Sequence, residues 1–150
     1  MGTVTVKLPF GSRPINTEGI IDYNAEYAFT RGQCHSLALA LHRLTGWQLY
    51  GLYKPKELCR GATPSHTVVR SPDGEYIDIG GNTALEDWRE YYPDAKPVAV
   101  TEAQVLAFED DDYCTPDIKA AMPYAVTLYV KYGKGQPTQL RLPFETTLIN

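Results

Sequence analysis

The chain of 150 residues lacks several features that mark other classes of protein. No apolar run approaches the roughly 18 residues that a membrane-spanning helix needs, so a membrane role has no support. Its 14 lysines and arginines are scattered and outnumbered by 18 acidic residues, which gives a net charge of -4. Nucleic-acid affinity depends on clustered basic residues, and this composition therefore argues against a nucleic-acid partner.

Cysteine is also scarce. Cys34, Cys59 and Cys114 are an odd set, and no apolar N-terminal segment resembles a signal peptide, so reduced thiols in the cytoplasm are the simplest expectation. Zinc ligation by Cys34, His35, Cys59 and His66 is disfavoured, because adjacent Cys34 and His35 point apart on a helix and the other spacings match no common zinc pattern. We therefore expect no metal site.

The composition is that of a folded protein. Hydrophobic residues make up 43% of the chain and charged residues 21%, and both are spread throughout rather than segregated. A chain of this length buries roughly 70% of the surface that its unfolded form exposes, so neither a metal nor a disulfide is needed for stability. Without repeats or a linker, residues 1–150 are predicted to form a single domain.

The clearest helix signal covers residues 34–44. Leu37, Leu41 and Leu44 recur at helical spacing, and Gly46 supplies the stop. The leucines at every second position within this run would also suit a strand. A helix is favoured because Leu and Ala are strong helix formers, no β-branched residue interrupts the run, and the run is long for a strand.

The remaining pattern mixes strands and helices, and it predicts an α+β fold. Residues 3–8 alternate as a strand that Pro9 ends, and the residues at 11, 12 and 14 indicate a turn. Residues 20–29 are ambiguous and residues 54–64 read as a loop. Further strands are predicted over residues 47–53, 98–100, 124–132 and 139–142, and further helices over residues 85–92, 102–108 and 117–122.

A β-hairpin is predicted over residues 66–70 and 75–79, around the turn sequence Ser-Pro-Asp-Gly at 71–74. In a type I turn with a left-handed Gly74, paired residue numbers sum to 146, and His66 and Asp78 become diagonal neighbours on one face of the hairpin. A plain two-residue turn would place them on opposite faces. The Pro-Asp-Gly sequence favours the first register.

Cys34, His66 and Asp78 are the parts from which a cysteine nucleophile is built. A helix N-terminus and an adjacent imidazolium both lower the pKa of a thiol, and the free amide hydrogens of the first helical turn can hold an oxyanion. His66 would act as base and then as acid, and Asp78 would orient the imidazole. Taken singly, each residue has an ordinary structural explanation. Their combination favours catalysis.

Two other residues bear on this site. His35 is a rival to His66 as the base, because it follows the cysteine directly. Trp88 comes soon after Asp78 and is a candidate to border the substrate cleft. Most of the 11 tyrosines are expected in the core or on sheet faces, since large aromatic side chains supply much of the buried area of a domain this size.

The sequence around this site resembles the papain-like and transglutaminase-like superfamily of cysteine enzymes. The resemblance covers about residues 30 to 80 and lies in Gly32-Gln33-Cys34 opening a Leu/Ala helix, then Ser65-His66-Thr67-Val68-Val69 and Tyr76-Ile77-Asp78-Ile79. It implies a central helix that presents the cysteine and packs on an antiparallel sheet. It also implies acyl transfer through a thioester, with no cofactor. Papain-type peptidases place an oxyanion-hole Gln several residues before the cysteine, whereas the candidate here, Gln33, immediately precedes it.

The sequence therefore predicts a thiol-dependent amide or isopeptide hydrolase, or a glutamine deamidase, acting on a protein or peptide substrate. Small bacterial toxin or effector domains of this superfamily share the compact size, so delivery to another cell is an alternative to a cytoplasmic role. The competing hypothesis is a noncatalytic interaction module, such as a phage or bacterial regulator, that binds a partner through its aromatic and acidic surface. The sequence leaves the oligomeric state open, together with the choice between hydrolysis, deamidation and acyl transfer.

Overall fold

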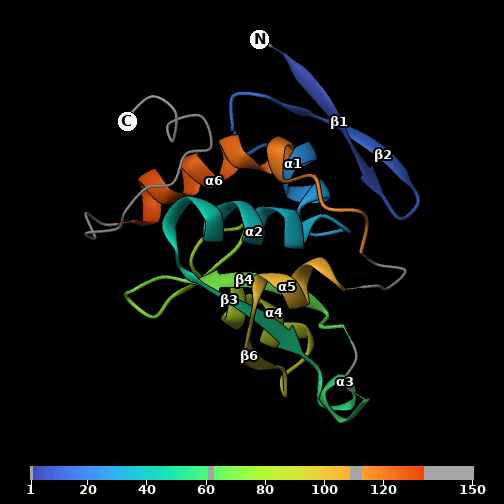
Figure 1. Ribbon diagram of the computed structural model, residues 1–150, viewed down its shortest axis with the longest axis vertical. Helices are drawn as coiled ribbons and strands as arrows, with labels where there is room; N and C mark the ends of the chain where they lie inside the picture. The colour runs from blue at the N-terminus through green and yellow to red at the C-terminus, as the bar shows by residue number, and fades with distance from the viewer. Residues whose placement is uncertain (1, 61–62, 109–112, 134–150) are drawn as a thin grey trace.

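The computed structural model describes residues 2–60, 63–108 and 113–133 (Figure 1). Its fold is α+β, as predicted, with helices packed on an antiparallel sheet. The sheet has four strands in the order β5-β4-β3-β6, and every neighbouring pair is antiparallel. The strands are β3 (Gln48–Tyr53), β4 (His66–Arg70), β5 (Tyr76–Ile77) and β6 (Lys96–Val100).

The central helix α2 (Cys34–Thr45) lies between this sheet and the long helix α6 (Ile118–Tyr132) (Figure 1). Ten of its twelve residues are buried, so its hydrophobic positions run around the whole helix rather than along one stripe. This burial on both sides explains why the leucine pattern also suited a strand. The helix ends at Gly46, which has φ 79° and whose N–H donates to the carbonyl of His42.

The helix α6 corrects the prediction of a short helix over 117–122 and a strand over 124–132. It is one helix that contains Pro123 in its second turn. The β-branched and aromatic residues of this segment are typical of strands, but Ala121, Tyr124, Ala125 and Leu128 are buried at helical spacing against α2. Tertiary packing therefore overrides local propensity here. The strand predicted over residues 139–142 lies outside the described residues.

An N-terminal hairpin stands apart from the main sheet. Strand β1 (Thr3–Leu8) occurs as predicted, but the residues read as turn formers belong to a second strand, β2 (Gly11–Asn16). Pro14 pairs with Thr5 within this hairpin, where each strand has a free edge that tolerates proline. Ile15 and Val6 are fully buried, and they attach the hairpin to the core.

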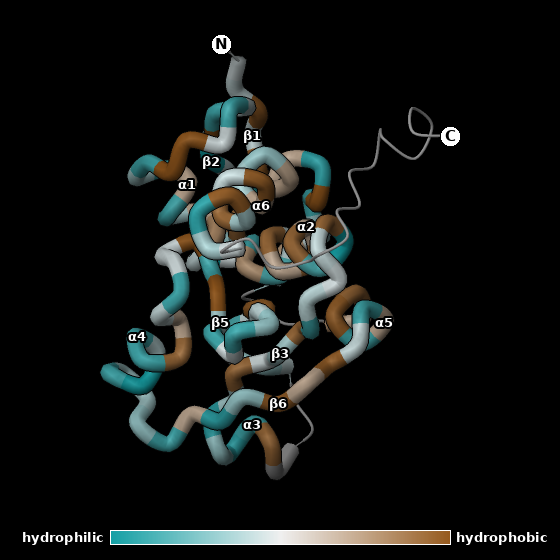
Figure 2. The backbone as a smooth tube through the Cα atoms, turned by 90° about the vertical axis from the view of Figure 1, so that its left-hand side faces the viewer, coloured by the Kyte–Doolittle hydropathy of each residue, from teal (hydrophilic) through white to brown (hydrophobic). Residues whose placement is uncertain are grey.

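Four shorter helices complete the described part of the chain: α1 (Tyr23–Ala28), α3 (Pro55–Arg60), α4 (Ala84–Tyr91) and α5 (Glu102–Leu106). The first resolves the ambiguous segment at 20–29, and its start is capped by the Asp22 side chain. The second lies in the predicted loop at 54–64. The last two match predicted helices. Figure 2 shows hydrophilic residues over α3 and α4 at the outside, and hydrophobic residues where α2 and α6 pack.

Within the described ranges, the structure contains no helix with the length and apolar character required to traverse a lipid bilayer.

Candidate active site

The β4–β5 hairpin has the predicted register. Val69 pairs with Ile77 and Arg70 with Tyr76, so paired numbers sum to 146. The turn is closed by the Gly74 N–H donating to the Ser71 carbonyl at 2.8 Å, and Gly74 has φ 85°, as a left-handed bulge residue requires. This register sends His66 and Asp78 to the same face of the hairpin.

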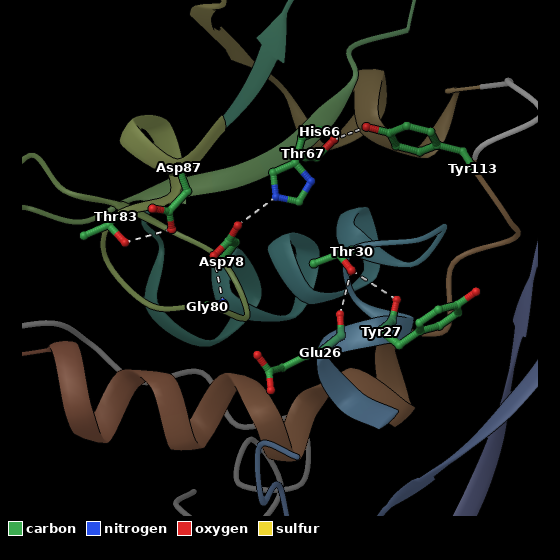
Figure 3. A network of polar contacts seen from close by, with 10 residues as sticks. All are labelled: Glu26, Tyr27, Thr30, His66, Thr67, Asp78, Gly80, Thr83, Asp87 and Tyr113. Carbon is green, nitrogen blue, oxygen red and sulfur yellow. Dashed lines mark hydrogen bonds and ion pairs between the residues drawn. The ribbon is translucent and has the colours of Figure 1, made fainter. Parts of the chain in front are cut away.

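His66 and Asp78 are hydrogen-bonded (Figure 3). The His66 Nε2–H donates to Oδ2 of Asp78 at 2.9 Å, and the other carboxylate oxygen, Oδ1, accepts from the Gly80 N–H at 2.8 Å. The backbone of Asp78 forms two further hydrogen bonds with Gly81, each 3.0 Å long. The carboxylate is therefore fixed by its own turn, and it orients the imidazole so that Nδ1 is left for another partner.

Cys34 is the first residue of α2, and Gly32 shapes the chain that leads to it. Gly32 has φ 125°, and a Cβ atom there would lie 2.5 Å from Cδ of Pro9. Only glycine fits this bend without strain. The Cys34 side chain is 5% exposed, so the sulfur lies at the edge of the interior with little direct contact with solvent.

The thiol of Cys34 and the imidazole of His66 ionise together. Burial, the largest influence, raises the pKa of Cys34, but the charge of His66 and polar interactions with His35 and His66 outweigh it and lower the pKa from 9.0 to about 5. Burial likewise lowers the pKa of His66, but the charge of Cys34 and hydrogen bonds to Asp78 and Cys34 raise it to about 10. At neutral pH the pair is therefore a thiolate and an imidazolium.

His35 lies beside the same sulfur but is held by another group. Its Nε2–H donates to the carbonyl of Cys114 at 2.7 Å, and the buried Nδ1 has no hydrogen-bond partner among the described residues. The imidazole is fully buried and packs against the ring of Tyr113. His35 thus supports the thiolate, while His66 alone of the two bonds to a carboxylate within the described part of the chain.

Gln33 does not fit the oxyanion role predicted for it. Its side chain is fully buried, and its amide nitrogen donates to the carbonyls of Lys7 at 2.8 Å and Thr115 at 3.3 Å. Its amide oxygen accepts from the hydroxyl of Ser36. Both ends of the amide are occupied, so Gln33 ties the start of α2 to neighbouring segments. The resemblance placed this residue at the site because it adjoins the cysteine, but Gln33 does not line the cleft and its amide bonds to neighbouring segments.

Trp88 covers the imidazole. Its ring stacks on His66 with centroids 5.1 Å apart and an angle of 18° between the planes. This contact shields one face of the imidazole from water and limits its rotation. Among the described residues, no group accepts a hydrogen bond from the buried Nε1 atom of Trp88.

Cys34, His66, Asp78 and Trp88 line one cleft of about 870 Å³. Most of the other lining residues come from the β1–β2 hairpin, from α1 and the segment after it, and from α4, and Tyr113 lines the cleft as well. Several of them are exposed aromatic side chains, including Phe10, Tyr23 and Tyr91. The cleft therefore brings a polarised thiol to the base of an open aromatic surface.

Neither His42 nor Cys114 lines this cleft. The His42 Nδ1–H donates to the carbonyl of Trp47 at 2.7 Å, which is a structural contact. Burial raises the pKa of Cys114, whereas Lys7 lowers it, and the net shift is upward, which disfavours a thiolate there. Cys59 belongs to α3 rather than a loop. Across the described ranges, no three His, Cys, Asp or Glu side chains form a group suited to hold a metal ion.

No family model, curated protein or solved structure matches this chain. The function must therefore be argued from the geometry of the cleft itself.

Sequence reasoning missed two residues of this site, Thr67 and Tyr113. Their hydroxyl groups lie 2.7 Å apart beside His66 (Figure 3), and Tyr113 lines the same cleft as Cys34. Thr67 was a detectable candidate, because it is next to His66 in the sequence. A tyrosine that follows an acidic run and lies far from Cys34 along the chain carries no local signal, so only the fold reveals it.

Proposed function

We propose that this protein is a thiol-dependent amide or isopeptide hydrolase, or a glutamine deamidase that uses the same intermediate, with a papain-like site. The observation that supports it best is the set of contacts among Cys34, His66 and Asp78 within one open cleft. An ion pair of thiolate and imidazolium at neutral pH is a nucleophile with an acid beside it. A cysteine that only fills space in the core requires neither a thiolate nor an adjacent imidazolium.

The acylation step follows from these charges. The Cys34 sulfur attacks the carbonyl carbon of the substrate, forming a C–S bond and sending the carbonyl electron pair to oxygen. His66 already carries the proton that the leaving nitrogen requires. When the tetrahedral intermediate collapses, the C–N bond breaks, His66 donates its proton to the departing nitrogen, and a thioester on Cys34 remains.

Deacylation uses the same residues in the opposite direction. The now neutral His66 takes a proton from a water molecule, whose oxygen attacks the thioester carbon. Collapse of this second intermediate breaks the C–S bond, releases a carboxylic acid and restores the thiolate. Asp78 keeps the imidazole in position and stabilises its charged form through both steps. Hydrolysis and deamidation differ only in the leaving group, which is an amine in one and ammonia in the other.

The shape of the cleft supports a polypeptide substrate. Exposed aromatic side chains such as Phe10 and Tyr91 stand along its walls, where they can pack on the side chains of an extended segment. The cleft also opens between the N-terminal hairpin and α4, which leaves room for a chain to pass over the sulfur.

Selective alkylation tests the proposal. At pH 6 to 7, iodoacetamide is expected to modify Cys34 well before Cys59 and Cys114, as read by peptide mass spectrometry, and His66→Ala should abolish that advantage. Glutamine-containing peptides then separate the reactions, since deamidation releases ammonia and cleavage creates new amino termini. Equally slow alkylation of all three cysteines would contradict an enzyme and favour the noncatalytic interaction module.

A further inference from the structure

Tyr113 reaches the reactive sulfur from a part of the chain far from both Cys34 and His66. Its side chain lines the same cleft as Cys34, and burial and then the charge of Cys34 contribute to the raised pKa of Tyr113, so the phenol lies near the sulfur. The ring is held on two sides, tilted against His35 at 4.7 Å and edge-on against Phe108 at 5.6 Å between centroids. These contacts fix the direction in which the phenol hydroxyl points.

The hydroxyl of Tyr113 has a second partner, which determines where its proton is available. Oγ1 of Thr67 lies 2.7 Å from the phenol oxygen, and Thr67 is buried. When the threonine hydroxyl donates to the phenol oxygen, the single proton of Tyr113 is free to be donated into the cleft. Burial, followed by the charge of Cys34, raises the pKa of Tyr113 well above its ordinary value, so the phenol keeps this proton at any pH where the enzyme works.

The proposed reaction needs a hydrogen-bond donor at this position. As Cys34 attacks a carbonyl, negative charge leaves the sulfur and collects on the substrate oxygen, which is joined to the sulfur through one carbon atom. A donor that lines the same cleft as the sulfur and is affected by its charge therefore lies near the oxygen that becomes charged. The side chain of Gln33, the candidate that the sequence suggested, is fully occupied elsewhere.

We propose that the Tyr113 hydroxyl, oriented by Thr67 in the same cleft as Cys34, is an oxyanion donor that forms a hydrogen bond with the substrate oxygen during acylation. The inference rests on the proposed function, because it assigns a further catalytic residue to that reaction. No proton is transferred in this step. The phenol keeps its hydrogen while the carbonyl electron pair moves to oxygen, and the hydrogen bond to the substrate oxygen is lost when the thioester is hydrolysed and the product leaves.

Two small reagents separate this role from simple support of the thiolate. Acylation by p-nitrophenyl acetate passes through a tetrahedral oxyanion, whereas alkylation by iodoacetamide displaces iodide and forms none. Tyr113→Phe retains the ring and removes only the hydroxyl. We expect the ratio of the acylation rate constant to the alkylation rate constant at Cys34 to fall about 100-fold, the typical effect of losing one oxyanion donor.

Two further variants complete the test. Tyr129→Phe removes a tyrosine hydroxyl from α6, outside the cleft, and is expected to leave the ratio unchanged. Thr67→Val keeps Tyr113 intact but removes the group that orients its hydroxyl, so it should lower the ratio by a smaller factor. The Thr67 variant also provides a readout if Tyr113→Phe does not fold.

The outcomes distinguish the inference from the function on which it rests. Equal changes of both rates in Tyr113→Phe, or faster acylation, would show that Tyr113 only positions or restrains the sulfur, and would overturn the inference while leaving Cys34 as the nucleophile. A wild-type Cys34 that neither reagent modifies would contradict the proposed function, and the inference with it.

Discussion

The imidazole of His66 bonds to Asp78 through Nε2 at 2.9 Å, and this contact decides which ring nitrogen faces the cysteine. With Nε2 occupied, Nδ1 is the atom that can share a proton with Cys34. The Gly80 amide in turn fixes the carboxylate of Asp78. The tight turn thus positions the carboxylate, and the carboxylate orients the imidazole toward the sulfur.

Replacing Asp78 with Asn should weaken this arrangement without enlarging or emptying the site. The hydrogen bond and the negative charge of Asp78 both raise the pKa of His66, so this pKa should fall in Asp78→Asn. Less imidazolium is then available to the leaving group, and turnover should fall by up to roughly 10,000-fold, the upper end of what positioned acid–base catalysis contributes. An NMR titration of the His66 ring protons measures the shift. Asp94→Asn, far from the imidazole in sequence, is the control; an unchanged pKa in Asp78→Asn would contradict the assigned role.

The pH dependence of alkylation should show the ion pair directly. Because the pKa of Cys34 is lowered to about 5, the thiolate persists down to that pH, and the rate should decline only as the pH falls through it. Turnover should also decline as the pH rises through about 10, where the imidazolium loses its proton. The two apparent values belong to the coupled pair. In denaturant, or in His66→Ala, the midpoint of alkylation should return toward the ordinary thiol range, and a folded protein that already titrates there would refute the ion pair.

His35 and His66 should differ in what their removal does. Both lower the pKa of Cys34, with the charge of His66 the strongest of the lowering effects. We therefore expect His35→Ala to raise the alkylation midpoint of Cys34 less than His66→Ala does, and to retain measurable turnover. Parallel pH profiles for the three proteins provide the comparison. If His35→Ala were the more damaging variant, His35 would be the base, as the rival hypothesis holds.

Gly32 should be intolerant of a side chain. Alanine there must adopt φ near 125° and also displace Pro9, so the free energy of unfolding should fall by at least about 1–3 kcal/mol, the usual cost of such backbone strain. Gly11→Ala is a matched control, because Gly11 has φ 135° but no atom within 4 Å of the added carbon. Denaturant melts give both values. Equal losses would mean that the contact with Pro9 contributes nothing.

The fold was predictable where local signals agree. The helix from Cys34 and the register of the hairpin both follow from short-range features, namely leucine and alanine content in one and a Pro-Asp-Gly turn in the other. The single helix that begins at Ile118 was not predictable from local signals, because Pro123 disfavours a helix interior and the nearby β-branched residues favour a strand. Packing against α2 stabilises the helix instead. Pro14 led to the prediction of a turn where the structure has a strand, because a free hairpin edge tolerates proline.

The site was predictable in part for a similar reason. Cys34, His66 and Asp78 lie in elements whose ends the sequence marks, so their convergence could be argued from register and helix position. Tyr113 and the true contacts of Gln33 depend on how distant segments pack around the start of α2. Adjacency to the cysteine suggested a role for Gln33 that its buried hydrogen bonds exclude.

The enclosure of α2 between α6 and the sheet has a consequence for how long the sulfur keeps its reactivity under stress. Amides in the most enclosed element of a protein exchange with solvent only when most of the molecule opens. Cys34, the proposed nucleophile, is the first residue of that element, whereas the β1–β2 hairpin and α4 that border the cleft lie at the periphery. As the temperature rises, the affinity for substrate should therefore fall first, and the lowered pKa of the Cys34 thiol should persist until the whole domain unfolds.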